Sequence, residues 1–387
     1  MVTLLAKLFI HDRENYGDSK VRTAYGTLCS IVGILLNVLM SAGKLIAGKL
    51  TGSISMVADA LNNISDAGSG IITFVGFKTS EKAADDDHPF GHGRIEYVSG
   101  FVVSLLVLLM GFELLKESIT KIIHPEPITA NVAAYVILIA SIMIKLYMAF
   151  YNSRIGKKLN STAMKAVAVD SLSDTLSTSV VIAATLISQF AHVNVDAYGG
   201  LIVSLVILYA GISSAKETIS PLLGQKPDEE LVEKVVSIVK HQPDVVGIHD
   251  MIIHDYGPGR LYISLHAEVP GEKNVFDLHE EIDDAEAELR KTLSCEAVIH
   301  MDPVETENEA VTEMKERVYK AVVSVNPEYT IHDFRMVPGK GHTNLLFDCV
   351  VAPTEHDLEG VKKRVTEAVE AACLNCFAII TVEHSYV

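Results

Sequence analysis

Apolar residues dominate six separate segments within the first 221 residues of the chain. The segments are 24–47, 54–77, 97–116, 131–151, 165–188 and 195–214, and short polar breaks separate them. Each is close to the about 20 residues that a helix needs to cross the hydrocarbon core of a bilayer. Gly, Ser and Ala are frequent within them, as close packing between membrane helices favours. The pattern therefore predicts an all-α membrane domain over residues 1–221, a bundle of six transmembrane helices.

After residue 221 the pattern changes to shorter, amphipathic elements that occur twice. The triplet Ile-His-Asp at 248–250 recurs at 331–333, an offset of 83 residues. In each copy a glycine-containing turn, an apolar strand-like run, a charged amphipathic helix and a β-branched run follow the triplet. With the helix that opens each copy, the order is α-β-β-α-β. We therefore predict two tandem α+β domains, over residues 222–305 and 306–387.

Composition and charge agree with a membrane part joined to a soluble part. The chain is 49% hydrophobic with a mean hydropathy of +0.29, yet 21% of its residues are charged. Residues 1–221 hold 17 acidic and 17 basic residues, whereas residues 222–387 hold 32 acidic and 15 basic ones. The whole net charge of −17 therefore lies in the second part. An acidic balance argues against nucleic acid and favours cations as partners.

Basic residues near the helix ends predict the orientation in the lipid bilayer. If the N-terminus is cytoplasmic, eleven Lys and Arg residues flank the helices on that side and three on the other. Cytoplasmic segments carry the excess of basic residues in membrane proteins. We therefore expect a multi-pass protein of the cell membrane with both termini, and both acidic domains, in the cytoplasm. The start of the chain lacks the uninterrupted apolar stretch of a cleavable signal peptide.

The cysteines do not predict a disulfide framework, because there are five of them in a long chain. Cys373 and Cys376 form a lone C-x-x-C pair, which we interpret as two thiols without a metal role.

Carboxylate and amide side chains interrupt the second and fifth apolar segments. Asp66 lies four residues after Asn62, and Asp174 lies four residues after Asp170. Residues four apart share one helical face, so each pair points in one direction. Neither segment has a Lys or Arg at its centre that would neutralise the three carboxylates, which leaves protonation or a bound cation. If the two faces meet, we expect these four side chains to surround a metal ion.

Two alternatives stay open on the residues alone. The carboxylates could cap a kink or bond the backbone, and Asp59 with Asn63 defines a competing register on the second segment. The chemistry of the ligand atoms narrows the choice of metal ion. Zinc sites favour Cys and His, whereas carboxylate and amide oxygens suit Mn²⁺, Mg²⁺ or Ca²⁺. No His or Cys lies in the core of either segment, which argues against zinc as the bound ion and favours manganese.

Three motifs together resemble those of the cation diffusion facilitator family of metal efflux transporters. They are ADALNNISD at 58–66, DDDHPFGHGRIE at 85–96 and DSLSD at 170–174, and the resemblance extends from about residue 20 to about residue 305. It implies a homodimer that exchanges cytoplasmic metal for protons by alternating access. It also implies that Asn62 and Asp66, rather than Asp59 and Asn63, are the ligand pair of the second segment, with Asp59 in a supporting role.

The resemblance also bears on the transported ion. Zinc-transporting members commonly have His or Asp at the first position of each pair. An Asn-x-x-x-Asp pair combined with an Asp-x-x-x-Asp pair is similar to the manganese group. We therefore expect Mn²⁺/H⁺ antiport, with Zn²⁺ or Fe²⁺ efflux by the same fold as the alternative.

The polar break 78–96 contains a second candidate site. Asp85, His88 and His92 would converge on one metal ion if the loop forms a turn. Pro89 and Gly91 argue against a regular helix there, and a bland solvated loop is the alternative. The family resemblance favours a peripheral metal site.

The first α+β domain offers a third candidate site. The resemblance implies a ferredoxin-like fold that binds metal near the dimer contact. The positions that match are His249, His266, His279, His300 and Asp302. The alternative to a metal site is that these histidines are ordinary surface residues, as histidines on a polar domain often are. Imidazole ligands would accept zinc or manganese.

The second α+β domain departs from the family, whose members usually have one such domain. At a fixed offset of 83 residues, the positions of the first copy map onto His332 (from His249), Cys349 (from His266), Lys362 (from His279) and Glu383 (from His300). Most ligands are lost in this alignment. We therefore predict a structural or dimerisation role for the second copy, with a divergent sensor as the alternative.

Two other functional classes compete with a transporter. A membrane metal sensor that does not transport would bind metal without flux. An intramembrane aspartyl hydrolase would use paired Asp side chains to activate water, but it would have no need of the histidine-containing loop. We expect a secondary transporter rather than an enzyme, with a divalent metal as cargo and no bound cofactor.

Overall fold

The computed structural model describes residues 2–16, 18–51, 54–124, 132–191 and 196–385. The chain forms two compact units. One comprises Met1–Gln225 with Tyr256–Gly259, and the other comprises Lys226–Asp255 with Arg260–Val387. We describe each unit by itself.

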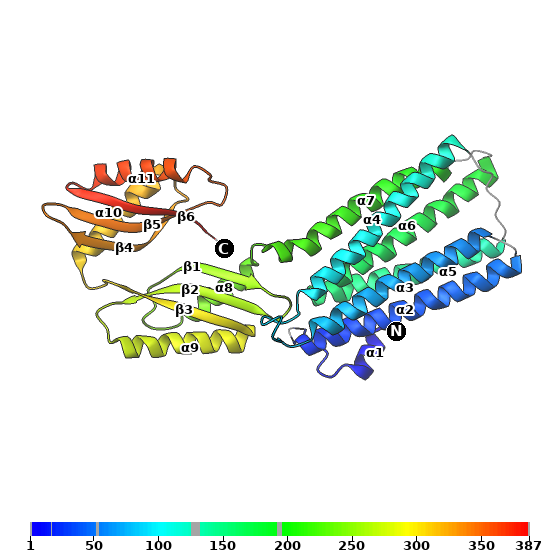
Figure 1. Cartoon of the computed structure of the whole chain (residues 1–387), viewed down its shortest axis with the longest axis horizontal. Coiled ribbons are helices and arrows are strands. Elements are labelled where there is room, and N and C mark those ends of the chain that lie inside the picture. The colour runs from blue at the N-terminus through cyan, green and yellow to red at the C-terminus, as the bar shows by residue number, and fades with distance from the viewer. Residues whose placement is uncertain (1, 17, 52–53, 125–131, 192–195, 386–387) are drawn as a thin grey trace. The chain divides into compact units, whose positions relative to one another are not determined.

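Long helices lying side by side make up the first unit (Figure 1). The helices are α1 (Val2–Phe9), α2 (Ser19–Thr51), α3 (Ile54–Ser80), α4 (Ile95–Ile123), α5 (Val132–Lys158), α6 (Thr162–Ala191) and α7 (Asp196–Ile219), and a 3-10 turn at Ser220–Leu223 follows. α2 packs most extensively on α3, α4 on α7, and α5 on α6. Each of the six segments predicted to be apolar helices falls largely within one of α2 to α7.

Four helices in the described part of the chain are long and apolar enough to cross a membrane. These spans are Lys20–Ile46, Ile95–Ile123, Tyr135–Lys158 and Ala197–Leu223, in α2, α4, α5 and α7. Large apolar side chains on these helices face outward, among them Leu39, Leu109, Met143 and Ile202. Such a surface is costly in water and suits lipid. The other two predicted spans form α3 and α6, the helices that carry the carboxylates.

A buried ion pair ties α2, α4 and the start of α6 together. The Arg22 guanidinium donates to both carboxylate oxygens of Glu96, at 3.0 and 2.7 Å, and the Ser161 hydroxyl donates to the same carboxylate. Glu96 is only 1% exposed. Because a charge at this depth needs a partner, the pair fixes how these helices meet.

The second unit contains two sheets with the same topology. The first set of elements is α8 (Glu229–Val239), β1 (Gly247–Asp255), β2 (Leu261–Pro270), α9 (Val275–Leu293) and β3 (Cys295–Val304). The second set is α10 (Glu309–Val325), β4 (Thr330–Pro338), β5 (Thr343–Val351), α11 (Leu358–Ala372) and β6 (Cys376–His384). Strand orders are β1-β2-β3 and β4-β5-β6, with the first pair antiparallel and the second parallel in each sheet. Both sets follow the α-β-β-α-β order expected from the sequence.

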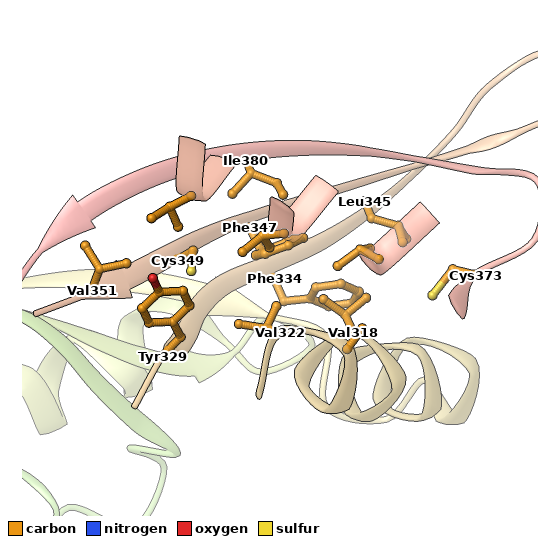
Figure 2. Close-up of a cluster of buried hydrophobic side chains, with 14 of the residues drawn as sticks. Val318, Val322, Tyr329, Phe334, Leu345, Phe347, Cys349, Val351, Cys373 and Ile380 are labelled. Atoms are coloured by element: carbon orange, nitrogen blue, oxygen red, sulfur yellow. The ribbon is translucent and has the colours of Figure 1, made fainter. Parts of the chain in front are cut away.

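Each sheet buries one face against its own helices. Along β5, Leu345, Phe347, Cys349 and Val351 alternate inward, as the period of two in a strand requires. Figure 2 shows these side chains packed with others from α10, β4 and β6. Burial raises the pKa of the Cys349 thiol to about 11, so it is a neutral core residue. Cys373 is buried in the same cluster.

Candidate metal sites

Three carboxylates meet in the first unit, from two helices. Asp66 of α3 and Asp170 and Asp174 of α6 each place one oxygen within 4.8 Å of the others. Asp66 is 7% exposed and Asp170 is 3% exposed. One oxygen of Asp170 is buried without a hydrogen-bond partner among the described residues. An unpaired buried carboxylate oxygen is costly, and a cation is one partner that would satisfy it.

A lysine from a third helix neutralises part of this charge. The Lys145 ammonium of α5 donates to Asp66 Oδ2 at 2.7 Å and to Asp174 Oδ2 at 2.5 Å, and Lys145 is 4% exposed. The conclusion that only protonation or a bound cation can balance the three carboxylates was therefore wrong, because Lys145 reaches them from a third helix, α5. The signal in the sequence was a lysine at the centre of an apolar segment, which needs a partner as much as an aspartate does.

Of the two asparagines next to each other on α3, the structure describes the side chain of Asn63 but not that of Asn62. Asn63 of α3 accepts from the Lys44 ammonium of α2 at 3.5 Å, so a second lysine approaches this region. The side chains of Asn62 and Asp59 lie outside the described residues. The role of Asn62 as a ligand therefore stays a prediction, and so does the choice of its register over that of Asp59.

The loop between α3 and α4 brings its three predicted residues together. Asp85 Oδ1 lies 3.4 Å from His88 Nδ1, and Asp85 Oδ2 lies 3.6 Å from His92 Nε2. The two imidazole rings are 4.6 Å apart between centroids. The hydrogen bond from Lys82 is the main reason that the pKa of Asp85 is lowered to about 2. Asp85 is thus an ionised acceptor at neutral pH, and the turn that the convergence required is present.

Four of the five residues predicted in the first α+β domain also converge. Asp302 of β3 lies at the centre, 3.2 Å from His249 Nε2, 2.8 Å from His266 Nδ1 and 3.2 Å from His300 Nε2. His249 and His266 are direct partners across β1 and β2, and His266 and His300 across β2 and β3. Three adjacent strands therefore bring these side chains around Asp302, with His249 and His266 at one of its carboxylate oxygens and His300 at the other.

His279 is the exception. Its helix, α9, places its Nε2 atom 3.8 Å from Asp283, and the side chain is 65% exposed. The structure thus provides a three-histidine, one-carboxylate group and leaves His279 with a separate carboxylate.

Strand pairing corrects the alignment of the two repeats. In the first sheet His249 pairs with His266, and Glu268, two residues further on, pairs with Asp302. In the second sheet His332 pairs with Asp348, and Val350, two residues further on, pairs with Glu383. The counterpart of His266 is therefore Asp348 rather than Cys349, and Glu383 corresponds to Asp302 rather than to His300. The fixed offset failed because the second copy is one residue shorter between its first two strands and again before its third.

Two protein-family models match this chain, and together they cover most of the helical unit and the first α+β domain. A family model described as the cation efflux transmembrane domain matches residues 30–223, and one described as the cytoplasmic domain of a cation efflux protein matches residues 227–304. A protein of Methanocaldococcus jannaschii named as a transporter is 32% identical over 280 residues, which cover 71% of this chain and 97% of that protein. The second repeat lies beyond both matched regions.

Cation-efflux pumps are also similar to this chain. The cation-efflux pump FieF of Shewanella oneidensis is 26% identical over 265 residues, covering 68% of this chain and 89% of the pump. The pump of the same name from Escherichia coli K12 is 27% identical over 285 residues, covering 72% and 94%.

Proposed function

Because this chain belongs to the cation diffusion facilitator family of cation efflux transporters, we propose that it exports divalent metal, with Mn²⁺ preferred, in exchange for protons. The observation that carries the proposal is the convergence of Asp66, Asp170 and Asp174 in the first unit. Asn62 completes the proposed transport site. These donors are oxygens, which suit Mn²⁺ better than the nitrogen and sulfur donors typical of zinc sites.

The Lys145 ammonium sets the net charge that the transported metal ion, or the protons exchanged for it, must neutralise. Three ionised carboxylates and one ammonium carry a net charge of minus two, which one divalent ion neutralises. Two protons neutralise it equally well. An exchange of one metal ion for two protons therefore keeps the charge of the buried site constant, which avoids the cost of an uncompensated charge in the membrane.

The position of the Lys145 ammonium also suggests the order of events. It contacts Asp66 and Asp174 directly, so an incoming ion competes with it for the same oxygens. We propose that the ammonium gives up these two contacts when metal binds from the cytoplasm but stays within the buried site, so that its charge still counts in the balance. It returns to the carboxylates when protons from the other side release the ion. The lysine would then limit how tightly the site holds its cargo.

The remaining features of the proposal concern assembly and orientation. We propose six membrane spans in the cell membrane, cytoplasmic termini, ferredoxin-like folds for the two α+β domains, and a homodimer. The excess of basic residues on one side of the helices supports the orientation. The acidic balance of residues 222–387 would raise the local concentration of cations near the entrance.

Flux in proteoliposomes tests the proposal. We expect Mn²⁺ transport that depends on an imposed pH gradient, and loss of this transport in Asp174→Asn. Glu117→Gln, which removes an exposed carboxylate on α4, a helix that carries none of the proposed ligands, is the matched control and should transport normally. Full transport by a folded Asp174→Asn protein would contradict the proposed site. Competition among Mn²⁺, Zn²⁺ and Fe²⁺ in the same assay decides between manganese and the alternative ions.

A further inference from the structure

Equivalent histidines of the two repeats meet inside the second unit. The rings of His249 in β1 and His332 in β4 stack at 4.1 Å between centroids, with 22° between their planes. Each precedes an aspartate in the left-handed conformation, Asp250 and Asp333, both at φ 50°, where the strand register shifts. The same local irregularity therefore presents the same side chain in both copies, and the two copies face each other through it.

Carboxylates from both repeats surround this pair. Asp250 lies 3.3 Å from His249 Nδ1 through one oxygen and 3.5 Å from His332 Nε2 through the other. Glu383 of β6 lies 2.9 Å from the same nitrogen of His332. Atoms of His249, Asp250 and His332 all lie within 4.8 Å of one another. Each repeat thus contributes one imidazole and one carboxylate to a single cluster.

The imidazoles are buried, yet most of their nitrogens make no hydrogen bond. The side chains of His249 and His332 are 8% and 9% exposed. Both nitrogens of His249 and Nδ1 of His332 have no hydrogen-bond partner within the described part of the chain. Buried polar atoms are normally satisfied, because an unmet one destabilises the folded protein. The unmet nitrogens of His249 lie beside carboxylates, Nδ1 beside Asp250 and Nε2 beside Asp302, which is the arrangement expected of a metal ligand.

We propose that His249, Asp250, His332 and Glu383 form a divalent metal site shared by the two repeats, suited to Zn²⁺. Two imidazole nitrogens and two carboxylate oxygens supply the four donors of a tetrahedral zinc site. The site differs from the Asp302 group because His332 and Glu383 belong to the second repeat, and the two groups share His249. His249 lies between the two groups, with Nε2 towards Asp302 and Nδ1 towards Asp250. Bound metal would join the second repeat to the first within one chain.

Zinc content of the purified full chain tests this site independently of transport. All proteins carry Asp174→Asn, so that the transport site does not contribute. After loading with Zn²⁺ alone and gel filtration, we expect His332→Ala and Glu383→Gln each to hold one ion fewer per chain than their parent. His356→Ala, which removes an exposed histidine of the same repeat, should hold as many as the parent.

Hydrogen exchange supplies a second measurement. Zn²⁺ should slow exchange of the amides in β4 and β6 in the parent protein but not in Glu383→Gln. This substitution keeps the size of the side chain, so it decides the question if His332→Ala fails to fold. Unchanged zinc content and unchanged protection in a folded Glu383→Gln protein would overturn the proposal. An equal loss of zinc in His356→Ala would also overturn it.

Discussion

The carboxylate group of the helical unit and the histidine groups of the α+β unit use different chemistry. Asp66, Asp170 and Asp174 offer oxygens only, and Lys145 already balances part of their charge. The groups around Asp302 and His332 combine imidazoles with carboxylates, and no Lys or Arg of the described residues forms an ion pair with them. The first arrangement suits an ion that must be released, because protons and an ammonium compete for its ligands. The second suits an ion that stays bound.

The sharpest test of this difference removes one ligand from each group. Asp170→Asn should lower Mn²⁺ flux by at least about 100-fold, since even outer-shell partners of a metal are worth about 10- to 100-fold. His266→Ala, its counterpart in the Asp302 group, should keep flux within about twofold of the parent at saturating Mn²⁺. Flux measured in proteoliposomes checks both. Equal losses in the two variants would remove the distinction between a transport group and a retained-metal group.

Asn62→His tests whether ligand chemistry selects the ion. An imidazole in the oxygen group should shift preference from Mn²⁺ towards Zn²⁺ by about tenfold, equivalent to about 1.4 kcal/mol. The measurement is the ratio of transport efficiencies for the two ions. An unchanged ratio would place Asn62 outside the ligand set.

Lys145→Gln tests the competing ammonium. Without it, the carboxylates should bind Mn²⁺ more tightly and release it more slowly, so half-saturation and maximal flux should both fall by about three- to tenfold, or about 1 kcal/mol. Lys44→Gln, at the neighbouring lysine near Asn63, is the matched comparison and should have a smaller effect. A rise in half-saturation instead would mean that Lys145 supports metal binding rather than opposing it.

The smallest effect is expected at the loop. His88→Ala removes the exposed member of the proposed loop site, so the half-saturating Mn²⁺ concentration should rise by about two- to threefold, a cost below about 1 kcal/mol. Maximal flux should stay the same. A large loss of maximal flux would show that the loop group belongs to the transport path.

The sequence predicts the parts of this molecule that depend on local periodicity. Spacing of four residues on a helix brings Asp170 and Asp174 to one face, and the repeated Ile-His-Asp triplet marks equivalent strands in two domains. Contacts between distant elements were harder to predict. Lys145 lies in a third helix, 29 residues before Asp174, and nothing in its local pattern names its partners.

The second repeat illustrates the same limit. A fixed offset assigned Glu383 to the wrong counterpart, because shorter connections shift the strand register. The meeting of His332 with His249 also depends on how the two repeats pack against each other. Only the three-dimensional structure reveals that His332 and Glu383 of the second repeat form one cluster with His249 and Asp250 of the first.

Simultaneous recording of metal and proton movement tests the central claim most directly. Proteoliposomes containing the parent protein, with a pH-sensitive dye and a Mn²⁺-sensitive dye inside, give both fluxes in one experiment. The charge balance of three carboxylates and one ammonium predicts two protons moved against each Mn²⁺ ion, and neither flux in Asp174→Asn. Mn²⁺ movement without opposing proton movement, or coupled movement that survives in Asp174→Asn, would contradict it.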